Sequence, residues 1–193
     1  MAPNYPGSKD AMAGFKRCYK GRVAEESCTK LGRLDYAAGM SKDIQLFAPG
    51  VSADEDVIMA VGAPMLGMFN SSQWNHDFDN PQNKRIVPDF EKDYGRLLSL
   101  YAAQGYDEAM LIDAALRDVK GDLRDRDAVR KALERAGFKS SRGAMKFNAN
   151  HCPVQNYHPR VISGDAQGRI SNKTMDTIFD HHADAYVAQC RMK

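Results

Sequence analysis

The spacing of apolar residues along the chain predicts three well-formed helices. Residues 8–20 carry apolar side chains at helical spacing, and Gly21 ends that run. Residues 101–119 form the longest helical pattern. A third helix is expected over residues 125–137, because the Asp125 carboxylate can cap the free amides of its first turn.

The remaining segments are expected to alternate between strands and shorter helices. Strands are expected within residues 22–31, 41–50, 65–74, 143–148 and 156–162, with a hairpin turn at 163–169. Helices are expected at residues 51–62, capped by Ser52, at 79–95, interrupted by Pro88, and at 176–192. This alternation indicates an α/β architecture with mostly parallel strand pairing.

One expected helix has a start signal but too few residues to continue. Asp35 can cap a first turn, yet Gly39 follows four residues later and the next segment already has a strand pattern. A complete strand–helix–strand unit needs roughly 30 residues or more. The stretch therefore indicates either a short turn or lost sequence.

Charge and hydropathy exclude two classes of partner. Among 193 residues, 27 basic side chains are balanced by 25 acidic ones, so no basic stripe for nucleic acid is expected. The most apolar run, residues 57–69, is shorter than the ~20 residues of a membrane span. Residues 1–10 lack the basic start and apolar core of an export signal, so the chain as given is expected to stay in the cytoplasm.

The four cysteines favour neither a zinc site nor a redox motif. Cys18, Cys28, Cys152 and Cys190 form no CxxC pair. Two disulfides would be possible only in an oxidising compartment. We expect free and mostly buried thiols.

No metal site is expected from the histidines and aspartates. In a calcium loop counted from the first aspartate of residues 76–79, the sixth position holds Gln82 and the twelfth holds Pro88. A capping loop is favoured instead. His181 and His182 are adjacent, so on a helix they would point about 100° apart and could not share a metal.

Catalytic chemistry has no positive signal. Cys152 follows His151, but neighbours in sequence do not establish a nucleophile and base, and no third orienting group is evident. The chain has no glycine-rich phosphate loop and no nucleophile elbow. We therefore expect no enzyme activity and no cofactor.

Aromatic and amide side chains at element junctions are the candidate binding residues. They are Tyr5, Trp74, Tyr101 and Gln104. Aromatic residues can simply fill a core. Several at loop–helix junctions also match the lining of small-ligand clefts. Tyr106 is expected to serve packing.

Six segments, taken in chain order, resemble the periplasmic substrate-binding proteins of ABC transporters, in the branched-chain amino acid (Leu/Ile/Val-binding) family. The matching segments are residues 2–17, 46–62, 67–96, 101–116, 125–151 and 182–193. The resemblance covers nearly the whole chain. It is nearest to members associated with the transport of aromatic or related organic acids.

The resemblance implies a type I periplasmic-binding-protein fold that is incomplete in this chain. Such proteins have two Rossmann-like α/β lobes with mostly parallel sheets, joined by three crossovers, which close on a ligand. Residues 1–71 and 157–193 would belong to the C-terminal lobe, which lacks a helix–strand piece after Ala38. Residues 72–156 would form the later part of the N-terminal lobe, whose first portion is absent.

The same resemblance assigns part of a ligand site. Tyr5 matches a family tyrosine that closes over the ligand, and Tyr101 matches a position where the other lobe presents an aromatic ring. Trp74 and Gln104 are added from their junction positions. Gly50 stands where amino-acid-binding members place an acid that pairs with the ligand's ammonium group, and this favours an organic acid as ligand.

The expected function is capture of a small organic or aromatic acid, or an amino acid, for uptake through ABC permease subunits. The protein is expected to be a monomer, located in the periplasm by family resemblance. The alternatives are a cytoplasmic small-ligand sensor on the same fold and a truncated remnant that binds nothing. Because much of one lobe is missing, we expect weak binding or none, and an exposed sheet edge prone to association.

Overall fold

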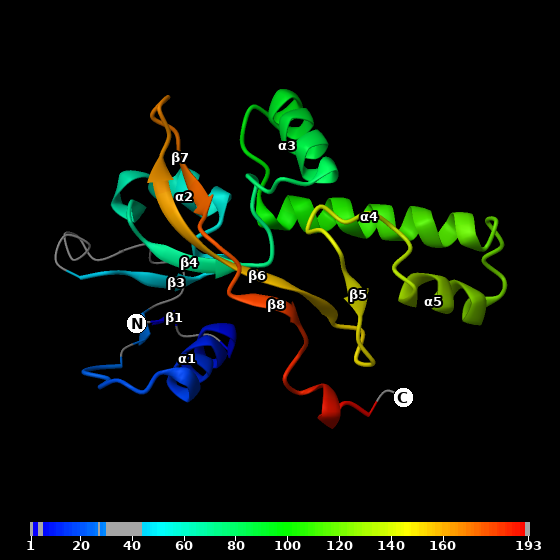
Figure 1. Ribbon diagram of the computed structural model, residues 1–193, viewed down its shortest axis with the longest axis horizontal. Coiled ribbons are helices and arrows are strands. Elements are labelled where there is room, and N and C mark those ends of the chain that lie inside the picture. The colour runs from blue at the N-terminus through cyan, green and yellow to red at the C-terminus, as the bar shows by residue number, and fades with distance from the viewer. Residues whose placement is uncertain (1, 4–5, 27, 30–43, 192–193) are drawn as a thin grey trace.

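A computed structural model describes residues 2–3, 6–26, 28–29 and 44–191 (Figure 1). The candidate ligand residue Tyr5 and the helix start at Asp35 lie outside the described residues. The proposed break after Ala38 lies outside them as well.

The larger sheet is built around one long strand. Strand β6, Pro153–Gly164, runs through the middle of the molecule and pairs with four others (Figure 1). The order is β3-β4-β6-β5, and β7 and β8 also pair with β6. The four partners of β6 are β4 (Phe69–Ser72), β5 (Lys146–Phe147), β7 (Ile170–Thr174) and β8 (Phe179–His182), and β3 (Phe47–Pro49) pairs with β4.

Strand pairing in the described residues is mostly antiparallel. Strands β3 and β4 are parallel, as are the short strands β1 (Ala2–Pro3) and β2 (Cys28–Thr29), whereas the four pairings of β6 are antiparallel. The expectation of mostly parallel pairing is therefore wrong for this part of the chain. A tight turn joins β6 to β7, and such a turn can only join antiparallel strands.

Helices surround this sheet, and their positions largely follow the apolar pattern. The helices are α1 (Pro6–Cys18), α2 (Glu55–Val61), α3 (Pro81–Tyr94), α4 (Leu100–Asp118) and α5 (Arg126–Glu134). The three helices predicted from periodicity correspond to α1, α4 and α5. The Asp125 carboxylate accepts hydrogen bonds from the backbone amides of Asp127 and Ala128, which confirms the predicted cap of α5.

Three local predictions are corrected by the structure. Helix α3 continues through Pro88 instead of being split, because Asn80 caps its start and the proline removes only one internal hydrogen bond. Ser52 lies in a 3₁₀ turn, Gly50–Ser52, and Asp54 directly precedes α2. The expected closing helix at 176–192 is instead strand β8 followed by a 3₁₀ turn, because β6 offers this segment strand partners.

In the part of the chain that the structure describes, the hydrophobic core forms two separate clusters. One cluster joins α2, the segment before β4 and strand β6, and its buried members are Ala53, Ile58, Met65, Met68 and Ile162. The other lies between the loop after β4 and helices α3 and α4, and its buried members are Trp74, Ile86, Leu98, Leu100 and Ala103. The two clusters share no residue.

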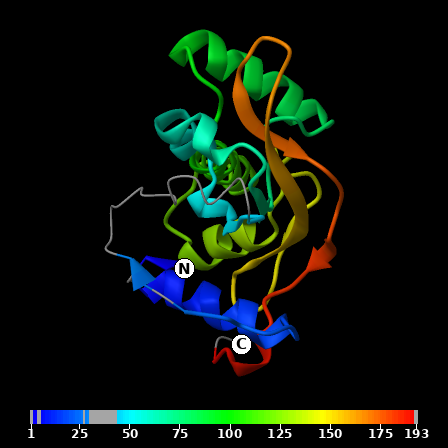
Figure 2. The same cartoon turned by 90° about the vertical axis from the view of Figure 1, so that its left-hand side faces the viewer.

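The N-terminal helix lies beside the C-terminal residues, away from both clusters (Figure 2). The Arg17 side chain donates a hydrogen bond to the Tyr186 hydroxyl, 2.6 Å. On the predicted apolar face of α1, the rings of Phe15 and Tyr19 stack at 4.8 Å but stay about half exposed. Helix α1 therefore forms as predicted without burying that face among the described residues.

The cysteines are more exposed than the sequence suggested. Cys18 and Cys152 are exposed free thiols, and Cys190 is a partly buried one. The expectation of mostly buried thiols is wrong for these three, because they lie at element ends or in loops rather than in either core cluster.

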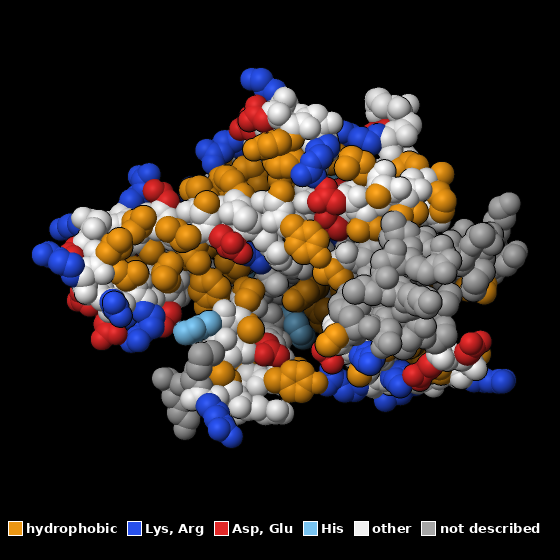
Figure 3. Space-filling view, turned by 180° about the vertical axis from the view of Figure 1, so that it is seen from behind, with side chains coloured by type: hydrophobic (Ala, Val, Ile, Leu, Met, Phe, Trp, Pro, Cys, Tyr) orange, Lys and Arg blue, Asp and Glu red, His pale blue; other side chains and the backbone are white. Residues whose placement is uncertain are grey.

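Exposed apolar side chains of the described residues include a group on helix α4 and Phe47 on β3. Helix α4 carries Tyr101, Ile112 and Leu116 on its exposed side, and from behind, hydrophobic side chains gather over the end formed by α4 and α5 (Figure 3). Phe47 on β3 is 76% exposed, and among the described strands β3 pairs only with β4. None of the helices in the described ranges is both long and apolar enough to span a membrane.

Candidate functional site

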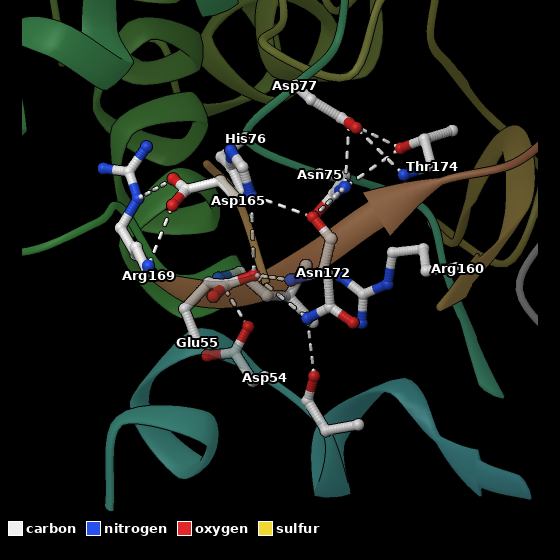
Figure 4. Close-up of polar contacts among 12 residues, drawn as sticks. Asp54, Glu55, Asn75, His76, Asp77, Arg160, Asp165, Arg169, Asn172 and Thr174 are labelled. Atoms are coloured by element: carbon white, nitrogen blue, oxygen red, sulfur yellow. Dashed lines mark hydrogen bonds and ion pairs between the residues drawn. The ribbon is translucent and has the colours of Figure 1, made fainter. Parts of the chain in front are cut away.

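A polar cluster that is mostly buried, with Asp77 at its exposed edge, lies between the two core clusters, and we call it the junction cluster (Figure 4). It draws side chains from the start of α2, from β4 and the loop that follows it, and from β6 and β7. Its members are Asp54, Glu55, Asn70, Asn75, His76, Asp77, Arg160, Asn172 and Thr174.

Arg160 is the buried cation of the cluster. Its side chain is fully buried, Nε donates to Asn70 Oδ1 at 2.7 Å, and Nη1 donates to the Trp74 carbonyl at 3.1 Å. Burial lowers the pKa of Arg160 to about 10, and the nearby carboxylates, Glu55 first, oppose that shift. The guanidinium therefore stays charged at neutral pH and fixes the loop after β4.

Asn172 on β7 is the most connected side chain of the cluster. Its Nδ2 donates to the Ala53 carbonyl at 2.7 Å and to Glu55 Oε1 at 3.0 Å, while its Oδ1 accepts from Asn70 Nδ2 at 2.8 Å. Its backbone carbonyl accepts from Asn75 Nδ2 and His76 Nε2. One amide residue thus joins α2, β4, β7 and the loop after β4.

Asp54 ties the start of α2 to the start of α4. Its Oδ1 accepts the backbone N–H of Leu100 at 2.9 Å, and a negative charge is favourable at a helix N-terminus. Ser99 Oγ accepts from the Ala102 amide in the same turn. Burial raises the pKa values of both Asp54 and Glu55, because water no longer solvates their charged forms.

The loop after β4 is held on both sides. Asp77 accepts from the backbone N–H and the hydroxyl of Thr174, at 2.9 and 2.6 Å. On the other side, Asn83 of α3 donates to the carbonyls of Asn75 and His76. Two neighbouring elements therefore fix this loop.

Three polar atoms of the junction cluster are buried without a hydrogen-bond partner among the described residues. They are Asp54 Oδ2, Asn75 Oδ1 and Arg160 Nη2. Such atoms are rare in native proteins and cost free energy when they stay unpaired. Three such atoms in one cluster mean that its side chains could form further hydrogen bonds.

Two of the three described candidate ligand residues, Tyr101 and Gln104, lie at the start of α4, beside this cluster. Tyr101 follows Leu100 and is 55% exposed, while Gln104, one turn further, is partly buried. Trp74 is fully buried in the second core cluster, and its indole N–H donates to Asn83 Oδ1 at 2.8 Å. Ligand contact by Tyr101, Gln104 or Trp74 stays a prediction, and for Trp74 the structure shows a packing role.

Two further sequence-based expectations concern this region. Tyr106 packs against the second core cluster, which confirms its predicted packing role. The junction cluster itself was not predicted. The only sequence signal for it was the amide-rich run at residues 70–77, which also suits an exposed loop.

Gly50 lies too close to β4 to carry a side chain. A Cβ atom placed there would lie 2.4 Å from the Ser71 carbonyl oxygen and 3.2 Å from the Ser72 Cβ. The Ser71 atom belongs to the backbone and cannot rotate away. In this arrangement the position is closed to every residue except glycine.

A hollow of about 350 Å³ lies on the outer side of the junction cluster. It is lined by α2, by residues 95–97 and by residues 168–170. An ion pair between Arg96 and Asp56 joins two of its walls. None of the candidate ligand residues that the structure describes, Trp74, Tyr101 and Gln104, lines it. Within the described ranges, no group of three or more histidine, cysteine or acidic side chains could hold a metal ion.

Comparison with known proteins gives one family and a set of related folds. A family model described as periplasmic binding protein matches residues 2–166. A curated relative, Leu/Ile/Val-binding protein homolog 6 of Brucella abortus (strain 2308), is 25% identical over 146 residues. That match covers 75% of this chain and 37% of the relative, so the chain spans just over a third of the relative's length.

Two solved structures share the fold. A solute-binding protein of an ABC transporter from R. palustris, in complex with benzoate, has a TM-score of 0.84 at 24% identity, covering 97% of this chain and 59% of that one. A second, from Rhodopseudomonas palustris BisB5 in complex with 3,4-dihydroxybenzoic acid, has a TM-score of 0.82 at 22% identity, covering 95% and 60%. These matches confirm the α/β type I periplasmic-binding-protein fold, present here in part.

Proposed function

Because this chain belongs to the periplasmic binding protein family, we propose that it acts as the solute-binding component of an ABC transporter. In this role it captures a small organic acid in the periplasm and delivers it to permease subunits. Binding and closure perform this work, and no catalytic step is needed.

The closed position at Gly50 is the observation that carries the ligand class. An amino acid brings a positively charged ammonium group, which needs a carboxylate partner once it is buried. The Ser71 carbonyl excludes an acidic side chain at position 50. An aromatic or other organic acid has no such requirement. The two related structures were solved with benzoate and 3,4-dihydroxybenzoic acid, which supports the same class.

We propose that the chain contributes to two lobes and that the ligand is held between them. Residues 1–71 and 157–193 form one lobe, and residues 72–156 form part of the other. The two separate core clusters support this division, because a cluster of its own is what each lobe needs. Tyr101 and Gln104 then face the ligand from the start of α4, and Tyr5 faces it from the opposite lobe.

Calorimetric titration with benzoate, 4-hydroxybenzoate and leucine tests this proposal. We expect the aromatic acids to bind more tightly than leucine. Tight binding of leucine would overturn the ligand class. The chain spans only part of its relatives, so we expect weaker binding from these residues alone than from a protein with both complete lobes.

Location in the cell separates transport from sensing. Fractionation of cells that produce the complete gene product is expected to place the protein in the periplasm. Recovery only in the cytoplasm would favour a ligand sensor on the same fold.

A further inference from the structure

Helix α4 carries apolar side chains on two opposite faces. Leu100, Ala103 and Ala115 are buried on its inner face. The outer face holds a second apolar row, which we call the α4 stripe, formed by the exposed residues Gly105, Ala109, Ile112 and Leu116. At about 3.6 residues per turn, the stripe fits within a sector about 60° wide, and no charged residue of α4 falls inside that sector.

The outer face of α4 is unusual for a helix at a protein surface, where polar or charged side chains normally face water. Ile112 is 53% exposed and Leu116 is 37% exposed, although α5 packs on the same helix. Seen from behind, hydrophobic side chains gather over the end of the molecule formed by α4 and α5 (Figure 3). Apolar surface of this kind is typical of a site that another polypeptide covers.

The spacing of the α4 stripe favours another helix as the partner. Successive members are separated by four, three and four residues, which is the spacing of the apolar seam between helices that pack side by side. Gly105 and Ala109 are small, and a Cβ added at Gly105 would meet no other atom within 4 Å. A partner helix can therefore approach this part of the stripe closely, while Ile112 and Leu116 supply apolar contact area.

The charges beside the stripe are complementary to a second copy of themselves. Asp113 and Arg117 flank one side of the stripe, and both are exposed. They lie at equal distances before and after position 115. If two α4 helices pack antiparallel about a two-fold axis at that level, Asp113 of each copy faces Arg117 of the other. The opposite flank of the stripe carries Glu108, about two turns from the axis.

From these observations we propose that the α4 stripe is the interface of a homodimer, in which two copies of this chain pair their α4 helices antiparallel. A two-fold interface uses the same surface on both copies, so the stripe can cover itself. Ile112 and Leu116 lie within about one turn of the axis and form its apolar centre. A homodimer differs from the monomer expected from the sequence. It does not depend on the proposed function, because the stripe contains none of the candidate ligand residues.

Sedimentation velocity of the full chain over a range of concentrations tests the dimer. The chain without substitutions is expected to shift from monomer to dimer as its concentration rises. Ile112→Glu places a charge at the centre of the interface on both copies, so we expect the dissociation constant of the dimer to rise about 100-fold or more. If circular dichroism shows that Ile112→Glu has lost its helices, Ala109→Glu introduces the same charge elsewhere on the stripe.

The matched control is Ile178→Glu. Ile178 is 51% exposed, compared with 53% for Ile112, and it lies between β7 and β8, outside the α4 stripe. This change should leave the dissociation constant of the dimer unchanged. Equal effects of the two isoleucine substitutions would overturn the proposed interface.

Charge reversal tests the antiparallel arrangement. Asp113→Arg and Arg117→Asp each place like charges opposite one another in a homodimer, so each should weaken it. In a mixture of the two variants, position 113 of one copy and position 117 of the other again carry opposite charges. Native mass spectrometry is therefore expected to show heterodimers at concentrations where either variant alone is monomeric. Each variant keeps its own like-charge pair within α4 in the mixture, so a change in helix stability cannot produce this recovery.

Two further results would count against the proposal. The absence of heterodimers in the mixture would overturn the antiparallel arrangement. A chain that stays monomeric at every concentration would overturn the dimer itself. The stripe would then be left to a different polypeptide, such as one that matches the part of the related structures that this chain does not span.

Discussion

At the scale of single residues, the buried guanidinium of Arg160 has the largest expected effect on stability. It neutralises part of the charge of three nearby carboxylates, Glu55, Asp54 and Asp77. Removing one partner from a buried charged group leaves the other partners uncompensated. Arg160 is therefore a structural requirement of the junction cluster.

Arg160→Ala is expected to lower the free energy of unfolding by about 3–5 kcal/mol, measured by urea denaturation. Arg169→Ala is the matched control, because its ion pairs with Glu91 and Asp165 are partly exposed and should contribute about 0–1 kcal/mol. Equal losses in the two variants would contradict this assignment.

Burial of Asp54 and Glu55 makes stability depend on pH. Their pKa values in the folded state lie above the ordinary values of 3.8 and 4.5. The folded state therefore holds these protons more tightly than the unfolded state does. The contribution of these groups to stability falls as pH rises from the ordinary pKa values through the raised ones.

Asp54→Asn should weaken this pH dependence, because an amide keeps an oxygen to accept the Leu100 N–H and does not ionise. Unfolding free energies measured across the acidic range are expected to show a smaller decline with rising pH in the variant. Asp79→Asn is the control. Lys84 lowers the pKa of Asp79 in the folded state, so this change should affect the pH dependence in the opposite direction. Parallel curves for Asp54→Asn and the unchanged protein would refute the prediction.

The sequence located part of the candidate site at this scale but not the junction cluster. Tyr101 and Gln104 could be placed at the start of a helix, because helical periodicity and the preceding serine are local signals. Asn172 and Arg160 are polar residues in ordinary strand patterns. Their burial depends on β6 and β7 packing against α2 and the loop after β4, which no local pattern encodes.

At the scale of elements, the turn at Gly50 lies in close contact with strand β4. A side chain there would meet the Ser71 carbonyl. Strands β3 and β4 pair in parallel beside this turn, so any displacement would disturb their register at Pro49 and Ser71. The pairing of β3 with β4 therefore requires glycine at position 50.

Gly50→Ala is expected to lower the free energy of unfolding by about 1–3 kcal/mol, because overpacking forces the backbone to shift. Gly105→Ala is the matched control. Gly105 is exposed inside α4 with no atom within 4 Å of an added Cβ, so this change should raise stability by about 0.5–1 kcal/mol. Chemical denaturation measures both, and a neutral Gly50→Ala would contradict the predicted clash.

Elements that depend on a local sequence pattern were predicted well. Elements that depend on pairing with a strand distant in sequence were not. Helix α5 followed from Asp125 and its apolar spacing. The sequence of residues 176–192 carries no signal against a helix. The segment nevertheless contains a strand, in which Phe179 pairs with Tyr157 on β6. The mostly antiparallel pairing likewise follows from the hairpin between β6 and β7 and from the central place of β6.

At the scale of the whole molecule, the exposed apolar surfaces are the main expected liability. Strand β3 is paired only with β4 among the described strands, and Phe47 on it stacks on Phe69 with 5.6 Å between ring centroids. An edge strand with an exposed aromatic side chain favours pairing with another chain.

Phe47→Lys is therefore expected to reduce concentration-dependent association, measured by sedimentation velocity over a range of protein concentrations. Tyr94→Lys is the matched control, because Tyr94 is 66% exposed but lies at the end of α3. An equal effect of both changes would indicate a general gain in solubility. If the protein without substitutions is monomeric at every concentration, the exposed edge of β3 does not cause association.

The attachment of α4 has a mechanical consequence. The 19-residue helix is a rod of about 27 Å from its first Cα to its last. Its first amide is held by Asp54, and Asp107 in its middle accepts hydrogen bonds from Ser140, Ser141 and Arg142. A tilt of roughly 10° about Asp54 would carry the far end of the helix by about 5 Å, given that length, and residues 140–142 would have to move with it. A small rotation in the interior thus becomes a much larger displacement at the opposite end of the molecule.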